Sequence, residues 1–249
     1  MKYKALIFDL DNTAFPTGLE HLPSEKLIQV VMEAKKKVSV SIATARRISS
    51  VRQVFKMLAL KSPSIITGGT QIVDPITEKI LWSQNIDQKS LMQILQITKG
   101  YANETILGDE QSPYDFTSPE QPRRLYPIIY IRNPTKEMAM NIVGKLKSVS
   151  DISYVTSPSW IKGWTDIHVT HKMGTKEHGV NKLLTMLNVS KDQVIAVGDN
   201  NNDEALFKSA GFKIAMGNAT ENLKKMADFI APPVTEDGLA YAIEKFILK

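Results

Sequence analysis

The chain has 249 residues, enough for one or two globular domains, and its 43% hydrophobic and 23% charged residues are ordinary proportions for a folded protein. The formal net charge is only +5 and the basic residues are scattered, so we expect no nucleic-acid partner. The lack of cysteine excludes disulfides, zinc–thiolate sites and a cysteine nucleophile, which fits a cytoplasmic protein. No apolar stretch approaches the ~18 residues of a membrane span, so we expect no membrane partner.

The N-terminal part of the chain has the strand–helix–strand pattern of a parallel sheet. Residues 5–8 form a short apolar run that ends at an acidic residue, as a buried parallel strand does. A helix is expected over residues 24–37, with Ser24 as its N-cap, and a second strand over residues 38–42. Such a unit favours a parallel sheet with helical crossovers.

The C-terminal part repeats this alternation. Its expected strands and helices are strands over 193–197, 212–215 and 229–231, and helices over 176–187, 203–210, 221–227 and 239–248. Together the two parts predict the α/β class, with a Rossmann-like three-layer core around a parallel sheet.

The middle of the chain has a different pattern, which predicts an inserted α+β module. Its helix-like and strand-like segments are helices near 87–101 and 136–149, strands over 126–132, 152–156 and 166–169, and a loop over 108–121. We therefore expect an α/β core formed by residues 1–83 and 171–249, with residues 84–170 as a separate α+β module inserted into it.

The first candidate catalytic segment is Asp9-Leu10-Asp11-Asn12-Thr13, which directly follows the first strand. Open α/β sheets bind ligands at the carboxyl ends of their strands. Of two carboxylates there, one can attack phosphorus and the other can serve as acid and base. Asp pairs also occur as simple turn formers, so this segment alone does not establish a site.

Two further segments offer groups that bind phosphate. Thr44-Ala45-Arg46 follows the second strand, where a hydroxyl and backbone N–H groups can hold phosphate oxygens, although a helix N-cap is the better explanation of this segment taken alone. Lys176 opens a predicted helix and could neutralise a phosphate, although most exposed lysines are only solvated charges.

The fourth segment is Gly198-Asp199-Asn200-Asn201-Asn202-Asp203, which follows a predicted strand. Two acids and several amides in a tight turn suit a hard cation with oxygen ligands, and Mg²⁺ is the default choice where phosphate is also bound. An Asx-rich turn without a metal is the alternative. In combination, the four segments supply the nucleophile, acid/base, positive charge and metal ligands that phosphoryl transfer needs.

These motifs resemble the haloacid dehalogenase-like phosphatases, in particular the Cof-type branch with a type-II cap. FDLDNT is similar to the family's first motif, DxDGT, and ATAR to the second, a Thr or Ser followed by Gly-Arg. TKEHGVNKLL is similar to the lysine motif and GDNNND to the acidic GDxxND motif. Thr67-Gly68-Gly69-Thr70 stands where the branch usually carries an Asn-Gly-Ala turn. Asn12 and Ala45 replace glycines of the family pattern, and asparagine tolerates the left-handed backbone better than most residues.

The resemblance implies that residues 1–83 and 171–249 are the catalytic core and that residues 84–170 are a cap domain that sets substrate specificity. It also implies a role for each motif residue. Asp9 should attack phosphorus, and Asp11 should protonate the leaving oxygen and later activate water. The implied phosphate-binding groups are Thr44, Ala45 through its N–H, Lys176 and Asn202. The implied Mg²⁺ site is formed by Asp9, Asp11 through its backbone carbonyl, Asp199, and Asp203 as a ligand or as an orienter of ligands.

The expected activity is Mg²⁺-dependent hydrolysis of a small phosphorylated metabolite, for example a sugar phosphate. A phosphomannomutase-like phosphomutase and a non-catalytic protein that binds a phosphorylated metabolite are the two alternatives. The cap residues that could contact the substrate are Arg123, Arg124, Arg132, Trp160, Lys162 and Trp164, although such residues are more often structural or merely exposed.

Overall fold

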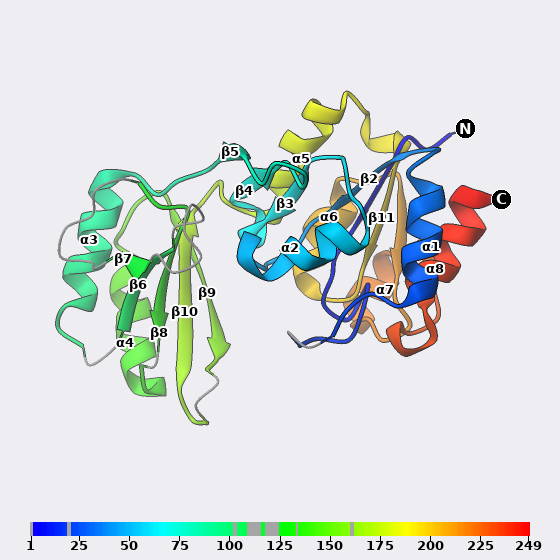
Figure 1. Cartoon of the computed structure of the whole chain (residues 1–249). Helices are drawn as coiled ribbons and strands as arrows, with labels where there is room; N and C mark the ends of the chain where they lie inside the picture. The colour runs from blue at the N-terminus through cyan, green and yellow to red at the C-terminus, as the bar shows by residue number, and fades with distance from the viewer. Residues whose placement is uncertain are drawn as a thin grey trace. The chain divides into compact units, whose positions relative to one another are not determined.

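The computed structural model describes residues 2–18, 21–101, 104–108, 116–117, 125–132, 134–159 and 162–249. They form two compact units (Figure 1). The first unit, called the core unit below, comprises Met1–Trp82 and Lys176–Lys249, and the second, the inserted unit, comprises Ser83–Thr175. None of the described helices is long and apolar enough to cross a membrane.

The core unit is built around a parallel sheet with the strand order β13-β12-β11-β1-β2. Its strands are β1 (Ala5–Phe8), β2 (Ser39–Ile42), β11 (Val194–Gly198), β12 (Phe212–Ala215) and β13 (Phe229–Ile230). β1 lies in the middle, paired with β2 and β11, and all four of its residues are buried. A strand covered on both faces is apolar throughout, which is why residues 5–8 were recognisable from sequence.

Helices cover both faces of this sheet, which confirms the predicted three-layer α/β core. They are α1 (Glu25–Ala34), α2 (Ile48–Met57), α5 (Lys176–Leu187), α6 (Glu204–Lys208), α7 (Glu221–Met226) and α8 (Gly238–Ile243). Figure 1 shows α1 and α8 together on one side of the sheet, and α5 and α6 on the other. The predicted cap of α1 is present, because the N–H of Leu27 donates to Ser24 Oγ at 3.1 Å. The last predicted helix is in two parts, since a π-helical turn over Glu244–Leu248 follows α8.

The core unit also contains elements that the sequence pattern did not predict. Besides α2, these are the short strands β3 (Ser64–Ile66), β4 (Gln71–Val73) and β5 (Ile80–Ser83), which form a separate three-stranded sheet. None of these three strands contains an apolar run as long as the four residues of β1, so no comparable local signal marks them. The turn between β3 and β4 is left-handed at three successive positions, with φ of 51° at Thr67, 68° at Gly68 and 109° at Gly69.

The inserted unit is an antiparallel sheet with two helices on one face. The strand order is β7-β6-β8-β10-β9. Its elements are α3 (Gln88–Thr98), β6 (Glu104–Gly108), β7 (Phe116–Thr117), β8 (Ile128–Arg132), α4 (Lys136–Leu146), β9 (Ile152–Pro158) and β10 (Thr165–His171). Ile129 of β8 and Ile167 of β10 share one apolar cluster with Leu91 of α3 and Ile142 of α4, and Figure 1 shows both helices along this face. β6 was not predicted, and the expected loop over 108–121 lies outside the described residues except at Gly108, Phe116 and Thr117.

Candidate active site

Three of the four sequence motifs lie at the carboxyl ends of neighbouring strands. Phe8 of β1 is in register with Ile42 of β2 and with Val197 of β11, so the residues that follow these three strands share one edge of the sheet. Asp9, Thr44 and Asp199 therefore come together, and all three are buried. Burial of carboxylates at a strand end is costly unless other groups compensate their charge.

Lys176, the first residue of α5, compensates part of this charge. Its Nζ lies 3.1 Å from Asp9 Oδ1 and 2.5 Å from Asp203 Oδ1, and the three side chains are almost completely buried. Burial alone would lower the pKa of Lys176, but the charges of Asp9 and Asp203 outweigh it and raise the pKa above the ordinary value. Lys176 is therefore a fixed cation between two acids.

The side chain of Asp203 forms hydrogen bonds with the backbone of its own loop. Its Oδ2 accepts hydrogen bonds from the backbone N–H groups of Asp199 at 3.1 Å and Asn200 at 3.2 Å, while Oδ1 accepts from Lys176. A Cβ on Gly198 would come within 2.6 Å of the Asp203 Cβ, so only glycine allows this close approach. Asp203 thus fixes the position of both Lys176 and the loop that carries Asp199.

The oxygen donors at this edge fit a divalent cation. Asp9, Asp199 and Asp203 each offer one carboxylate oxygen, and these atoms lie within 4.8 Å of one another. Three carboxylates with no nitrogen or sulfur donor form a site for a hard cation such as Mg²⁺. Asp199 is held by Thr13, whose Oγ1 donates to Asp199 Oδ1 at 2.8 Å.

The electrostatics of these acids agree with that chemistry. Burial raises the pKa of Asp9 to about 7, against the opposing effect of Lys176. Burial also raises the pKa of Asp199 to about 6, and the hydrogen bond from Thr13 only partly offsets it. Two acids whose ionised forms are this disfavoured would gain from a positive ion placed between them.

The side chain of Asp11 does not join the acidic group. Its carboxylate is bound by Arg46, with 2.9 Å from Nε to Oδ2 and 2.6 Å from Nη2 to Oδ1. A metal contact through its backbone carbonyl, as expected from sequence, stays a prediction. Asn12 adopts the expected left-handed backbone, with φ of 57°, so the turn keeps its shape without glycine.

The predicted phosphate-binding residues occupy different environments. Thr44 is fully buried and its Oγ1 accepts from the N–H of Arg46 at 3.1 Å, but the N-cap residue of α2 is Arg47, so Thr44 is not the cap of that helix. Ala45 is exposed at the tip of this turn, and Asn202 is exposed in the 3₁₀ turn Asn201–Asp203. Their binding of phosphate stays a prediction.

Three residues near the site were not singled out from sequence. Thr13 and Arg46 belong to the quoted motifs but had no separate role assigned. Asn218 donates through Nδ2 to the carbonyl of Asn12 at 2.8 Å and accepts through Oδ1 from the N–H of Val234, which ties the first motif to the C-terminal segment. No local pattern reveals such a contact, because the two partners are 206 residues apart.

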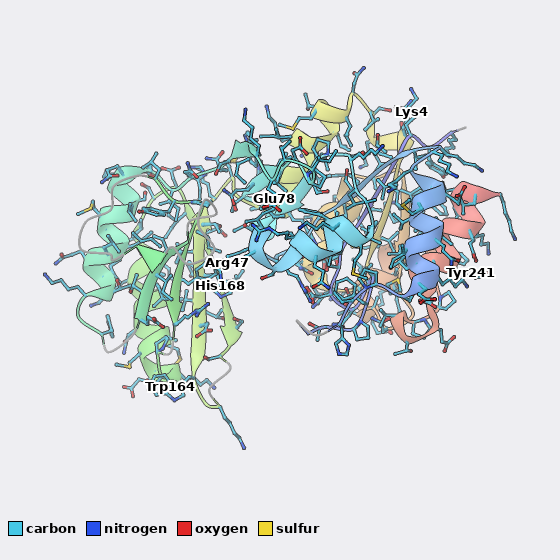
Figure 2. The ribbon with its side chains drawn as sticks, viewed as in Figure 1. Lys4, Arg47, Glu78, Trp164, His168 and Tyr241 are labelled. Carbon is cyan, nitrogen blue, oxygen red and sulfur yellow. The ribbon has the colours of Figure 1, made fainter. Side chains whose placement is uncertain are left out.

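Contact between a substrate and the cap residues proposed from sequence stays a prediction. Arg132 lies with its guanidinium 5.8 Å from the centre of the Tyr130 ring, and Lys162 is exposed. Figure 2 labels Trp164, half-buried just before β10, and His168 further along that strand. Arg123, Arg124 and Trp160 lie outside the described residues.

The chain is similar to a family of hydrolases, to individual phosphatases and to proteins of known structure. The model of the haloacid dehalogenase-like hydrolase family matches residues 6–243. A phosphoglycolate phosphatase of Methanobrevibacter smithii is 42% identical over 82 residues, a match that spans 33% of this chain and only 35% of that protein. A 5-amino-6-(5-phospho-D-ribitylamino)uracil phosphatase of Bacillus subtilis is 27% identical over 261 residues, 98% of this chain and 96% of that protein. A crystal structure from Thermotoga maritima has the same fold, with a TM-score of 0.83, 21% identity and coverage of 98% of this chain and 97% of that one.

Proposed function

The chain belongs to the haloacid dehalogenase-like hydrolase family, and from that premise we propose that it is a Mg²⁺-dependent phosphatase of small phosphorylated metabolites. The observation that carries the proposal is the position of Asp9, at the end of β1 and in contact with Lys176. A carboxylate in this position can accept a phosphoryl group, and the family relatives named above are phosphatases.

The reaction proceeds in two steps. In the first, an Asp9 oxygen forms a bond to phosphorus while the bond to the ester oxygen breaks, and that oxygen takes a proton from Asp11. In the second, water attacks the aspartyl-phosphate and gives its proton to Asp11, and the bond between phosphorus and Asp9 breaks. The sum is ester and water to alcohol and phosphate, with Asp11 as acid and then base.

Electrostatics decides whether Asp9 can act. A nucleophilic carboxylate must be ionised, and the burial that raises its pKa to about 7 works against this. Lys176 works in favour of the ionised form and also attracts the incoming phosphate dianion. Asp9 and Asp199, with the Asp11 carbonyl, would hold Mg²⁺, which when bound offsets the repulsion between carboxylate and phosphate.

The substrate class is a small phosphate monoester, with sugar phosphates as the first choice. Two relatives support this class by their names, since one acts on phosphoglycolate and the other on a phosphorylated ribityl compound. The inserted unit is proposed to supply specificity as a cap, because the core unit already contains every group that the two chemical steps need.

The test is a phosphate-release screen of the purified protein over phosphorylated metabolites with Mg²⁺, run in parallel with Asp9→Asn. The amide is close to the carboxylate in size but is not a competent nucleophile, so we expect release by the parent and none by the variant. Release without loss in Asp9→Asn would refute the mechanism. Transfer between positions of a sugar phosphate without release would instead identify a phosphomutase, and binding without either reaction a non-catalytic protein.

A further inference from the structure

Arg46 binds the carboxylate of Asp11 through two hydrogen bonds. The two donors Nε and Nη2 each reach a different oxygen of the carboxylate, at 2.9 and 2.6 Å. Only 10% of the Arg46 side chain and 30% of the Asp11 side chain are exposed. A bidentate pair this well covered fixes the plane and rotamer of the carboxylate, which a single hydrogen bond does not.

The guanidinium is itself held from several directions. Nη2 also donates to the carbonyl of Gly18 at 2.8 Å, and the guanidinium carbon lies 5.2 Å from the centre of the buried Phe15 ring. The backbone of Arg46 is fixed as well, because its N–H donates to Thr44 Oγ1 and its carbonyl accepts from Thr67. The arginine therefore links the turn after β2 to the loop after β1.

The two oxygens of Asp11 are not equivalent. Oδ1 accepts from Arg46 Nη2 and also from Thr17 Oγ1 at 3.2 Å, whereas Oδ2 accepts only from Arg46 Nε among the described residues. A carboxylate oxygen has two lone pairs, so Oδ2 keeps one for a proton.

We propose that Arg46 is the positioning residue for proton transfer by Asp11, and that Asp11 Oδ2 is the oxygen that carries the proton to the leaving group. The inference rests on the proposed function and adds an arginine that binds the acid rather than the phosphate. Lysine cannot replace it, because an ammonium is a single point charge without the planar fork that matches both oxygens.

The test compares Arg46→Lys with Arg52→Lys. Arg52 of α2 makes an equally bidentate pair with Glu78, at 2.7 Å to each oxygen, and is the matched control for loss of such a fork in the same unit. Both variants are assayed under single-turnover conditions with Mg²⁺, so that only the first step is measured. The substrates are p-nitrophenyl phosphate, whose leaving group needs no proton, and the best alkyl phosphate from the screen, whose leaving group does.

We expect Arg46→Lys to slow the alkyl phosphate by about 10²-fold, the lower range for loss of general acid catalysis, and p-nitrophenyl phosphate by less than about threefold. Arg52→Lys should leave both rates unchanged. In the Asp11→Asn background, Arg46→Lys should cause no further loss on the alkyl phosphate, because the group it positions is gone.

Equal loss on the two substrates would overturn the proposal, since it would mean that Arg46 acts on the phosphate or on the fold. An unchanged alkyl rate would overturn it too, as would full additivity with Asp11→Asn. A parent protein that hydrolyses neither ester would refute the proposed function itself, which is a different result from either of these.

Discussion

The two units of the molecule differ in what they bury. The core unit buries four charged side chains, Asp9, Lys176, Asp199 and Asp203, together with several hydroxyls. In the described part of the inserted unit no charged side chain is buried, and the buried hydroxyls include those of Ser90 and Thr98, which donate to backbone carbonyls at 3.0 and 3.2 Å, and that of Tyr126, which has no partner among the described residues. Because a buried charge costs several kcal/mol unless it is compensated, we expect the charged cluster to lower the stability of the core unit, a cost that the inserted unit does not have.

The largest expected effect is the loss of stability when the lysine of a buried ion pair in the core unit is replaced, compared with that of an exposed pair in the inserted unit. Lys176→Met should lower the free energy of unfolding by about 3 kcal/mol and abolish phosphate release, because it leaves Asp9 and Asp203 buried without a cation. Lys172→Met is the matched control, since the Lys172–Asp151 pair is exposed and should contribute nothing measurable. Urea denaturation at neutral pH without divalent metal measures both. An equal loss of unfolding free energy in the two variants would contradict the expected difference between the buried and the exposed ion pair.

The second prediction concerns the response of the core unit to pH and metal. The pKa of Asp9 is raised to about 7 and that of Asp199 to about 6, from a value of 3.8 in the unfolded chain. Between about pH 4 and 7 the folded protein therefore binds more protons than the unfolded chain, so its stability without metal should fall as pH rises.

Mg²⁺ should cancel this fall and raise Tm by several degrees at pH 7, because it binds the folded state alone. Thermal unfolding at a series of pH values, with and without Mg²⁺, tests this. Asp199→Asn, which removes one proposed ligand, should lose most of the Mg²⁺ response. A response that is undiminished in this variant would contradict the assignment of the cation to Asp199.

A third, smaller effect compares two left-handed glycines, one in each unit. Gly68 has φ of 68° and Gly163 has φ of 87°, and a Cβ at either would meet nothing within 4 Å. Gly68→Ala and Gly163→Ala should therefore each cost about 1 kcal/mol, from backbone strain alone. Only Gly68→Ala should also lower kcat/KM, since the Gly68 N–H donates to the carbonyl of Thr44 in the proposed phosphate-binding turn. If Gly163→Ala lowered kcat/KM by a similar factor, the loss would come from backbone strain in general and not from the turn that contains Gly68.

The smallest effect is a pH response of the inserted unit with the opposite sign. Burial lowers the pKa of His168 below its ordinary 6.5, so the folded protein binds fewer protons here than the unfolded chain. This contribution to stability is present above about pH 6.5 and is lost as pH falls below it. His168→Gln should flatten the acid side of the stability profile measured by thermal unfolding at pH 5 to 7. If His168→Gln left the decrease in Tm between pH 7 and 5 unchanged, that decrease would come from groups other than His168.

Prediction from sequence worked best where a strand or a site is defined by local spacing. The apolar run 5–8 and the acids that follow it share one short segment, so both the strand and the candidate nucleophile were recognisable. Helix α5 was predicted with its observed bounds, because Lys176 opens a regular apolar stripe.

The remainder depends on contacts between distant segments, which no local pattern encodes. The pairing of Arg46 with Asp11 and of Asn218 with Asn12 needs the folded sheet to bring the partners together. The strands β3 to β5 contain no apolar run as long as that of β1, so they were missed. In the inserted unit, the strand-like segments 126–132, 152–156 and 166–169 were recognisable, but the sequence did not indicate how they pair.

The most direct test of the central claim is to look for the phosphoryl group on Asp9. The parent protein is mixed with its best ester substrate and Mg²⁺, quenched in acid within one turnover and digested for mass spectrometry. We predict the added mass of one phosphoryl group on the peptide that contains Asp9, and none in Asp9→Asn. Consumption of the ester with no phosphorylated peptide, or with the phosphoryl group on another residue, would contradict the account.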